Sequence, residues 1–277
     1  CMQGGIHPSF TGETYVDLIR AAKAGAPDIH VHAFSPLEVT RGAETYDFEG
    51  DLSGSAFTDD DPENPDPRRS RVRAFLRTLR DAGLGSLPGT AAEILDDDVR
   101  AAMCPDKITA REWLEVVSDA HRVGLPTTST LMFGHVDADD NWARARHLVA
   151  LRDQHARSLL AGGVGFTEFV PLPFVHFEAP AFRRGEARRG PTLRECLLAH
   201  AVARLALAPA GLANVQASWV KMGPELAGRL LEVGCNDLGG TLMNESITRA
   251  AGARHGQEMS AARLEAIAKA AGRKVRM

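Results

Sequence analysis

Short apolar runs alternate along the chain with longer stretches in which apolar residues recur every three or four positions. The short runs are typical of buried parallel strands, and the longer stretches are typical of amphipathic crossover helices. The alternation therefore predicts a mixed α/β fold of about six βα units. The strands are predicted over residues 28–34, 84–87, 126–133, 164–172, 214–220 and 236–242, and the helices over 11–24, 70–82, 110–123, 139–156, 192–207 and 224–233, with a helical pair after Ser246.

Glycines mark the ends of four of these helices. Gly25, Gly83, Gly124 and Gly234 each follow a helical pattern, where glycine is the residue that most readily ends a helix. The rhythm of strands and helices also continues past Gly162 without a change to linker-like composition. We therefore expect residues 1–277 to form one domain.

An acidic segment interrupts the pattern. Residues 44–66 contain nine Asp and Glu residues and no Lys or Arg, and glycines and prolines lie in and beside them. A segment of this composition cannot bury enough apolar surface to form a core. It predicts a solvated loop insertion at about residues 43–69.

Composition narrows the choice of partners and compartment. The net charge is −4 and no basic stretch is interleaved with aromatic residues, so no nucleic-acid partner is expected. Cys1, Cys104, Cys196 and Cys235 lie far apart, which favours free thiols in a reducing compartment. No apolar run approaches the roughly 20 residues that span a bilayer. A cytoplasmic protein without membrane contact is therefore expected.

Polar residues gather at the carboxyl ends of the predicted strands. In a parallel barrel these ends carry the functional site. Each such residue also has an ordinary structural role open to it, since Ser, Thr and His in strands commonly satisfy neighbouring backbone groups. The candidates are Gly4, Gly5, His30, His32, Glu93, Thr128 to Thr130, His135, Glu168, His176, Gln216, Ser218, Asn244 and Glu245.

The stretch from Gly85 to Asp97 joins a strand end to a tight turn and a helix start. Pro88 and Gly89 end the strand and let the backbone approach a ligand closely. Thr90 and Glu93 have the spacing of a capping box, which would account for both residues without a ligand. The sequence leaves both interpretations open.

A metal-dependent hydrolase is one function that the residues alone suggest. His30 and His32 alternate by two along a strand, so both imidazoles face the same side and could bind one divalent ion. His135, His176 and Asp237, near other strand ends, could complete the ligand set. A metal ion bound there would lower the pKa of a water molecule for attack on an amide or ester.

Several longer motifs point to a specific family. They are CMQGGIHP, HVHAFSPLEV, AGLGSLPGTAAEIL, CPDKI, VGFTEFVPLPFVHFEAP, ARRGPT, QASWVKMG and GGTLMNESITRAAGARHGQE. From Cys1 to about Glu258 the chain resembles the radical S-adenosylmethionine (SAM) enzymes that make the deazaflavin chromophore. The similarity is greatest to the tyrosine-using part of FO synthase, which occurs as a separate CofH subunit or as the C-terminal half of a fused, FbiC-type enzyme.

The resemblance implies a TIM-type (βα) barrel with SAM and a [4Fe-4S] cluster as cofactors. Its reaction would break the Cα–Cβ bond of L-tyrosine and transfer the 4-hydroxybenzyl unit to 5-amino-6-(D-ribitylamino)uracil. The cofactor supplies the radical chemistry, and the protein positions the substrates and excludes water. The implied partners are the other FO synthase half or subunit and an electron donor.

The resemblance also suggests roles for individual residues. Gly4 and Gly5 would meet the methionine amino group of SAM through their backbone, and Glu93 would contact its ribose or amino-acid portion, with Thr130 a further cofactor contact. No catalytic residue is assigned. The candidates on the substrate side are His30, His32, Ser35, His135, Glu168, Gln216 and Glu245.

One departure from the family pattern concerns the cluster. The family holds it with a CxxxCxxC loop, and this sequence has no such motif. We therefore expect the cluster cysteines upstream of Cys1 and the barrel to be incomplete, with the first strand and most of the second missing. Unpaired edges are then expected at the strands over residues 28–34 and 236–242. Such a chain would bind no cluster and be inactive alone, or would be a non-catalytic remnant that serves as a binding scaffold.

Overall fold

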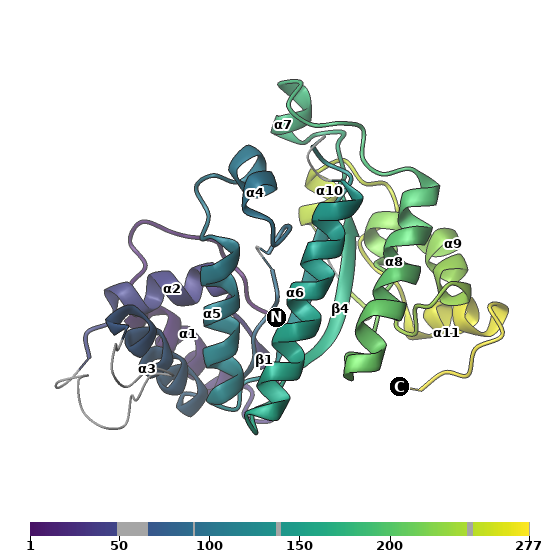
Figure 1. Cartoon of the computed structure of the whole chain (residues 1–277). Coiled ribbons are helices and arrows are strands. Elements are labelled where there is room, and N and C mark those ends of the chain that lie inside the picture. The colour runs from purple at the N-terminus through teal and green to yellow at the C-terminus, as the bar shows by residue number, and fades with distance from the viewer. Residues whose placement is uncertain (49–65, 91, 137–139, 243–245, 277) are drawn as a thin grey trace. The chain divides into compact units, whose positions relative to one another are not determined.

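The computed structural model describes the chain apart from residues 49–65, 91, 137–139, 243–245 and 277 (Figure 1). The fold is mixed α/β with short strands, as the sequence predicts. The strands are β1 (Val31–His32), β2 (Leu84–Ser86), β3 (Thr127–Phe133) and β4 (Phe166–Pro173). The helices are α1 (Gly12–Gly25), α2 (Pro36–Thr45), α3 (Pro67–Asp81), α4 (Asp97–Met103), α5 (Ala110–Arg122), α6 (Asn141–Leu160), α7 (Pro180–Arg183), α8 (Leu193–Leu207), α9 (Trp219–Glu232), α10 (Ile247–Ala250) and α11 (Ala261–Ala270).

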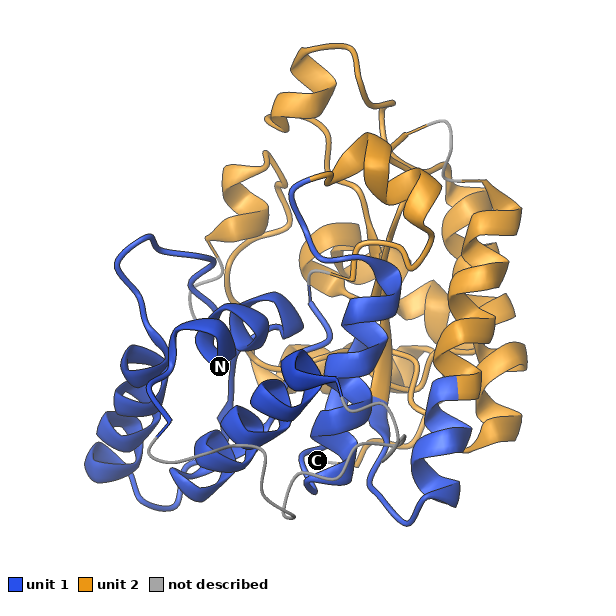
Figure 2. Ribbon diagram, turned by 60° about the vertical axis from the view of Figure 1, so that its left-hand side comes forward, with its two compact units in different colours: residues 1–91, 106–129, 154–167 blue, residues 92–105, 130–153, 168–277 orange. Residues whose placement is uncertain are grey.

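The chain divides into two compact units, which we describe separately (Figure 2). Unit 1 comprises residues 1–91, 106–129 and 154–167, and unit 2 comprises residues 92–105, 130–153 and 168–277. The expectation that residues 1–277 form one domain stays a prediction.

In unit 1 the strands pair in parallel. Val31 lies opposite Leu84 and His32 opposite Ser86. On the other side of β1, the Met2 amide donates to the His32 carbonyl (2.9 Å) and the Phe34 amide donates to the Met2 carbonyl (3.2 Å). The expectation of an unpaired edge along residues 28–34 is therefore wrong, because Met2 pairs with that edge.

In unit 2 the later strands are reduced to parallel bridges, Phe169 with Val215 and Gln216 with Asp237. Residues 219 and 220, predicted as strand, begin α9 instead. The helix predicted from residue 224 therefore starts earlier and kinks at Gly223 (φ 79°), just before Pro224. Proline lacks an amide hydrogen and clashes with the preceding turn, which explains a kink at this point.

Capping boxes start four of the helices, and this local chemistry explains where they begin. In α2, α5 and α8 the third helical residue is a glutamate that bonds back to the cap, in the pairs Ser35 and Glu38, Thr109 and Glu112, and Thr192 and Glu195; in α1 the pair is Thr11 and Thr14. Helix α2 was not predicted, although its Ser-Pro-x-Glu start is visible in the sequence. Helix α2 ends at Thr45, and α3 begins at Pro67, where Asp66 caps it. The insertion between the two helices is therefore shorter than the predicted residues 43–69.

Of the two interpretations of Thr90 and Glu93, the capping box is wrong. The helix after β2 begins at Asp97, and its cap is Asp96, whose carboxylate accepts the Val99 amide hydrogen (3.3 Å). Glu93 instead has a left-handed backbone, with φ 46°. Two consecutive Asp residues in the first turn also favour this later start, because negative charge stabilises a helix N-terminus.

Glycine ends helices as predicted at three of the four positions. Gly83, Gly124 and Gly234 adopt φ values of 110°, 84° and 130°. Gly25 is instead the last residue of α1.

The core of unit 1 lies where α1, α2, α3 and α5 pack around β1 and β2 (Figure 1). Tyr15, Phe34, Phe75 and Leu79 are nearly or completely buried in it. Helices α2 and α3 approach closely because Gly42 faces the Phe75 ring, where a β-carbon would lie 2.4 Å from a ring atom.

A buried ion cluster joins α3 to α5 within this unit. The Asp119 carboxylate is fully buried and accepts hydrogen bonds from Arg73 at 2.8 Å and from Arg69 at 3.0 Å. Two guanidinium groups thus share one carboxylate, and removing that carboxylate would leave both charges without it in a low-dielectric environment.

A second buried network links α5 and α6 to β3. His121 is bonded through Nδ1 to Ser158 Oγ (2.7 Å) and through Nε2 to Thr127 Oγ1 (2.9 Å). Its ring also meets Phe166 edge to face. Burial lowers the pKa of His121 to about 3, so the ring is neutral at physiological pH.

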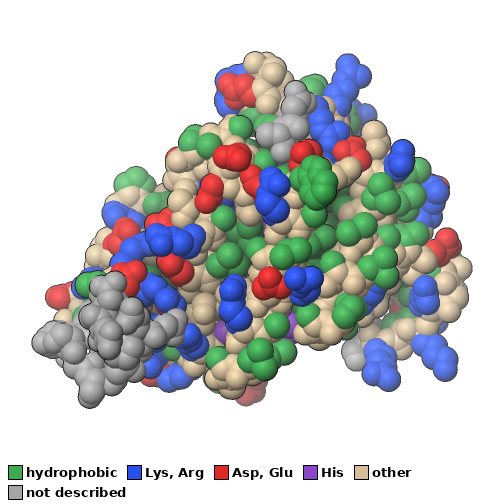
Figure 3. Space-filling view, viewed as in Figure 1, with side chains coloured by type: hydrophobic (Ala, Val, Ile, Leu, Met, Phe, Trp, Pro, Cys, Tyr) green, Lys and Arg blue, Asp and Glu red, His purple; other side chains and the backbone are tan. Residues whose placement is uncertain are grey.

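None of the helices in the described part of the chain combines the length and the apolar character needed to cross a membrane. Apolar side chains nevertheless gather over α6 and α8 (Figure 3). In unit 2 the exposed large apolar side chains of these two helices are Trp142, Val149, Leu193, Leu198, Val202 and Leu205.

We expect Asp119→Asn to lower the free energy of unfolding by about 3–5 kcal/mol, because it leaves Arg69 and Arg73 buried without their carboxylate. Urea denaturation of the variant measures this. Asp81→Asn is the matched control, since Asp81 is exposed and pairs with Arg80 at the surface. That change should cost less than about 1 kcal/mol. Equal effects of the two substitutions would contradict the role given to Asp119.

The buried histidine predicts a specific acid sensitivity. Because the folded-state pKa of His121 lies below 6.5, its contribution to stability is complete above that pH and is lost as the pH falls toward 3. Between pH 7.5 and pH 5 this loss is about 2 kcal/mol. Urea denaturation gives the free energy of unfolding at each pH. In His121→Gln, the fall in this free energy from pH 7.5 to pH 5 should be about 2 kcal/mol smaller than in the parent protein. Ser158→Ala is the control: it keeps the imidazole and should keep the pH dependence of stability. If His121→Gln also keeps that dependence, His121 is not its cause.

Candidate functional site

In unit 1, the two predicted histidines meet at one hydroxyl. His30 Nε2 and His32 Nδ1 each lie 2.7 Å from Ser86 Oγ, across the pairing of β1 with β2. The His30 ring also lies over Gly85, where a β-carbon would be 2.4 Å from a ring carbon. Burial, with a smaller effect of His30, lowers the pKa of His32 to about 4, which favours the neutral ring.

This arrangement confirms that His30 and His32 face the same side, but it shows no metal site. Among the residues that the structure describes, no three His, Cys, Asp or Glu side chains are grouped to hold an ion. Ser86, which sequence reasoning did not select, occupies the point between the rings. Two imidazoles and a hydroxyl together offer hydrogen-bond donors and acceptors to a polar substrate.

The turn at Gly4 and Gly5 is fixed by Glu38. One carboxylate oxygen accepts the Gly4 amide hydrogen (3.0 Å), and the other accepts from the amide (2.8 Å) and hydroxyl (2.7 Å) of Ser35. Gly5 is left-handed, with φ 67°, and both glycines face open space. Ser35, predicted on the substrate side, thus has its hydroxyl engaged in the cap of α2. Glu38 is the residue that sequence reasoning missed here, although the capping-box spacing could have revealed it.

The turn after β2 lies against β3. The Gly89 amide donates to Thr128 Oγ1 (2.8 Å), and a β-carbon at Gly89 would lie 2.3 Å from the Thr128 carbonyl oxygen. Trp113, fully buried, donates from its ring to the Thr90 carbonyl (3.4 Å). The Thr90 hydroxyl is buried without a hydrogen-bond partner among the described residues. An unpartnered buried hydroxyl is costly for folding alone, so it favours a ligand at this turn.

In unit 2, Glu93 combines backbone strain with a close contact to β3. Its φ of 46° lies in the left-handed region, and its carbonyl accepts the Met132 amide hydrogen at 2.6 Å. Such strain in a non-glycine residue concentrates at functional sites. Thr130, the other predicted cofactor contact of this unit, is buried in β3.

Unit 2 also carries a row of three polar side chains on neighbouring strands. Gln216 donates its amide hydrogen to Glu168 (3.0 Å), and the Asp237 carboxylate accepts from the Gly239 amide (2.6 Å). The Gln216 side chain packs against Gly239, where a β-carbon would lie 3.1 Å from its amide oxygen. Burial and the charge of Asp237 raise the pKa of Glu168, and the Gln216 hydrogen bond opposes this in part. The structure thus brings together Glu168 and Gln216 and adds Asp237, considered earlier only as a metal ligand.

His135 lies in the loop after β3, and both ring nitrogens are hydrogen bonded to the backbone. Nε2 donates to the Met132 carbonyl (3.0 Å), and Nδ1 accepts from the Val136 amide (2.9 Å). The His135 ring thus stabilises the conformation of the loop that carries it. The His135 carbonyl in turn accepts the Arg188 amide hydrogen (2.7 Å), which ties the loop after β3 to the loop after β4.

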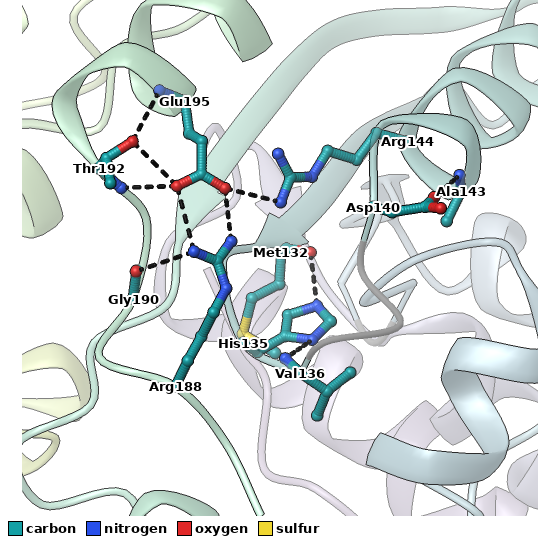
Figure 4. Close-up of polar contacts among 10 residues, drawn as sticks. All are labelled: Met132, His135, Val136, Asp140, Ala143, Arg144, Arg188, Gly190, Thr192 and Glu195. Carbon is teal, nitrogen blue, oxygen red and sulfur yellow. Dashed lines mark hydrogen bonds and ion pairs between the residues drawn. The ribbon is translucent and has the colours of Figure 1, made fainter.

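Glu195 anchors that second loop (Figure 4). It receives two hydrogen bonds from Arg188, at 2.5 and 3.1 Å, and one from Arg144 at 3.3 Å, while its carboxylate also caps α8 through Thr192. The Arg188 hydrogen bond and its neighbours lower the pKa of Glu195 to about 2. Arg188 and Arg144 are therefore paired within the chain itself, and the loop that carries Arg188 is held in place by an internal carboxylate.

Three further predictions concern other places in the chain. Glu245 lies outside the described residues. His176 stacks on Phe177. Cys104, Cys196 and Cys235 are buried, Cys1 is exposed, and all four are free thiols, as expected.

The sequence of this chain is similar to known proteins of one family. Residues 163–277 match the CofH/MqnC C-terminal region. Over 276 residues the chain is 45% identical to FO synthase of Mycobacterium leprae, covering 100% of this chain and 28% of that protein. The FO synthase of Streptomyces coelicolor is 45% identical over 99% of the chain, which again spans 28% of the relative.

The 5-amino-6-(D-ribitylamino)uracil–L-tyrosine 4-hydroxyphenyl transferase of Methanopyrus kandleri is 44% identical over 98% of the chain and 66% of its own length. The chain thus spans between about a quarter and two thirds of the length of these curated relatives. It belongs to the family of FO synthase and the CofH-type tyrosine 4-hydroxyphenyl transferases.

We expect Gly89→Ala to destabilise the turn after β2, because its β-carbon would overlap the Thr128 carbonyl. The free energy of unfolding in urea should fall by about 1–3 kcal/mol. Gly25→Ala is the matched control, since a β-carbon there meets nothing within 4 Å and φ is not positive. It should leave stability unchanged or slightly raised. A Gly89→Ala protein as stable as the control would show that the close approach is not needed.

Proposed function

We propose that the protein to which this chain belongs transfers the 4-hydroxybenzyl part of L-tyrosine to 5-amino-6-(D-ribitylamino)uracil in FO biosynthesis. The names of relatives that share 44–45% identity along the chain support the proposal. The observation that carries it in this structure is the row of Glu168, Gln216 and Asp237 on neighbouring strands of unit 2. The proposed protein partners are the other FO synthase half or subunit and an electron donor.

The row suits substrates rich in N–H groups. Carboxylates accept hydrogen bonds from amines, and a carboxamide both donates and accepts, as the edge of a uracil requires. The raised pKa of Glu168 means that this carboxyl takes up a proton more readily than an exposed one. In unit 1, His30, His32 and Ser86 provide a second set of donors and acceptors, suited to a phenol or a ribityl hydroxyl.

The finer fold that we propose is an incomplete TIM-type (βα) barrel. Parallel bridges support it within each unit: Met2 with Ala33, and Leu87 with Thr127, in unit 1; Phe169 with Val215, and Gln216 with Asp237, in unit 2. Helices separate most of the successive strand segments, as βα units require.

The fit to SAM rests on the turns described above. In unit 1 the proposed polar contacts are the Thr90 hydroxyl, buried without a partner among the described residues, and the open Gly4–Gly5 turn. In unit 2 the proposed contacts are Glu93 and Thr130. SAM, when bound, supplies the radical that acts on tyrosine. The chain's own residues would hold the cofactor, orient the substrates and exclude water.

The iron–sulfur cluster does not fit the described part of the chain. A [4Fe-4S] cluster of this type needs three closely placed thiolates, and no three metal-binding side chains are grouped there. Burial also raises the pKa of Cys196 to about 11 and that of Cys235 to about 12, which disfavours the thiolate that ligation requires.

Binding of the two substrates tests the proposal. We expect isothermal titration of the chain with 5-amino-6-(D-ribitylamino)uracil and with L-tyrosine to show saturable binding of at least one. Glu168→Gln should weaken that binding by about tenfold, because a hydrogen bond to a charged group is lost. Glu232→Gln makes the same chemical change on the exposed side of α9 and should leave the affinity unchanged. Absence of binding to either compound, or equal effects of the two variants, would count against the proposal.

A further inference from the structure

A groove in unit 1 shares none of its lining residues with the candidate functional site. It runs between α5 and the last turns of α6, beside the first turn of α3, and has a volume of about 460 Å³. Its polar lining consists of four arginines and a few neutral and acidic side chains. They are Arg69, Arg111, Arg122, Arg157, Ser118, Gln154, Ser158 and Glu115, with Leu114 and Ala161 completing the wall.

Positive charge dominates this groove. Among the described residues, four guanidinium groups line it, against the single carboxylate of Glu115, which lies 3.8 Å from Arg111. Arg69 is also paired with Asp119, which is fully buried and shared with Arg73. Figure 3 shows basic side chains over α5 and beside the lower part of α6. The groove therefore attracts anions.

The floor of the groove is ordered by buried hydrogen bonds. Gln154 is 4% exposed, and its amide nitrogen donates to Ser158 Oγ at 3.0 Å. Its amide oxygen accepts from Arg157 at 3.3 Å, which orients that guanidinium group. Ser158 is bonded to His121, so the chain of contacts reaches β3 through Thr127. These groups stand on helices packed into a core, and a site on such elements loses little entropy when it binds.

The lining also indicates what kind of anion fits. Guanidinium groups present paired donors that match phosphate oxygens, and several of them together favour a ligand with more than one negative charge. Among the described lining residues there is no aromatic side chain on which a nucleobase could stack. Leu114, Ala161 and the stems of the long side chains form the apolar part of the wall.

We propose that this groove binds a small phosphorylated metabolite that carries two or more negative charges. Arg111, Arg122 and Arg157 would contact its phosphate groups. Arg69, which is held by Asp119 on the side of α3, would add to the positive electrostatic potential in the groove. The site is separate from the substrate groups of the proposed function and does not depend on it.

Inorganic pyrophosphate is the probe. Isothermal titration of the full chain, with EDTA present and at about 150 mM KCl, should show saturable binding of one pyrophosphate per chain, because specific contacts survive where general attraction is screened. Arg157→Gln and Arg111→Gln should each weaken binding by about tenfold. Two variants are used so that a loss of folding in one, seen by circular dichroism, leaves the other informative.

Arg152→Gln is the matched control. Arg152 lies on the same helix, pairs with Asp153 at the surface and does not line the groove. Arg152→Gln removes the same charge as the groove variants and should change the affinity for pyrophosphate less than twofold. Failure of pyrophosphate to saturate, or an equal loss in Arg152→Gln and the groove variants, would overturn the proposal. Because the readout is pyrophosphate binding alone, its result is independent of whether the chain binds tyrosine or the uracil.

Discussion

In each unit a glutamate at the third position of a helix holds a loop in place. Glu38 caps α2 and fixes the Gly4 amide, and Glu195 caps α8 and anchors Arg188 and Arg144. A capping carboxylate has two oxygens, and the cap uses mainly one of them, so the other can bind a group distant in sequence. A local interaction that starts a helix therefore also sets the position of a remote turn.

The pattern of apolar positions was sufficient to predict β2, β3 and β4 and most of the long helices to within a few residues. It failed at the short or irregular elements, for identifiable reasons. Helix α2 follows β1 so closely that no separate helical period is visible, and α9 crosses a kink at Gly223 that periodicity alone does not show. Thr90 and Glu93 have the spacing of a cap, but the acidic run that starts at Asp96 provides a stronger one.

The candidate site was predictable where side-chain chemistry and strand position coincide. Alternation placed His30 and His32 on one side, and strand-end positions selected Glu168 and Gln216, which the structure brings within hydrogen-bond distance. Ser86 and Asp237 were not selected for these clusters because their roles come from pairing across strands, and pairing register is not visible in one sequence. Glu195 was missed because its partner Arg188 lies in an irregular loop whose path no sequence pattern indicates.

The left-handed backbone of Glu93 has a consequence for how this protein tolerates change. A residue with a β-carbon costs roughly 1–2 kcal/mol in that conformation, whereas glycine adopts it almost freely. If folding were the only requirement, glycine or asparagine would be the better residue at this position. A glutamate at this position therefore lowers stability relative to glycine. Among related sequences, the replacements accepted at this position would separate the demands of folding from those of chemistry.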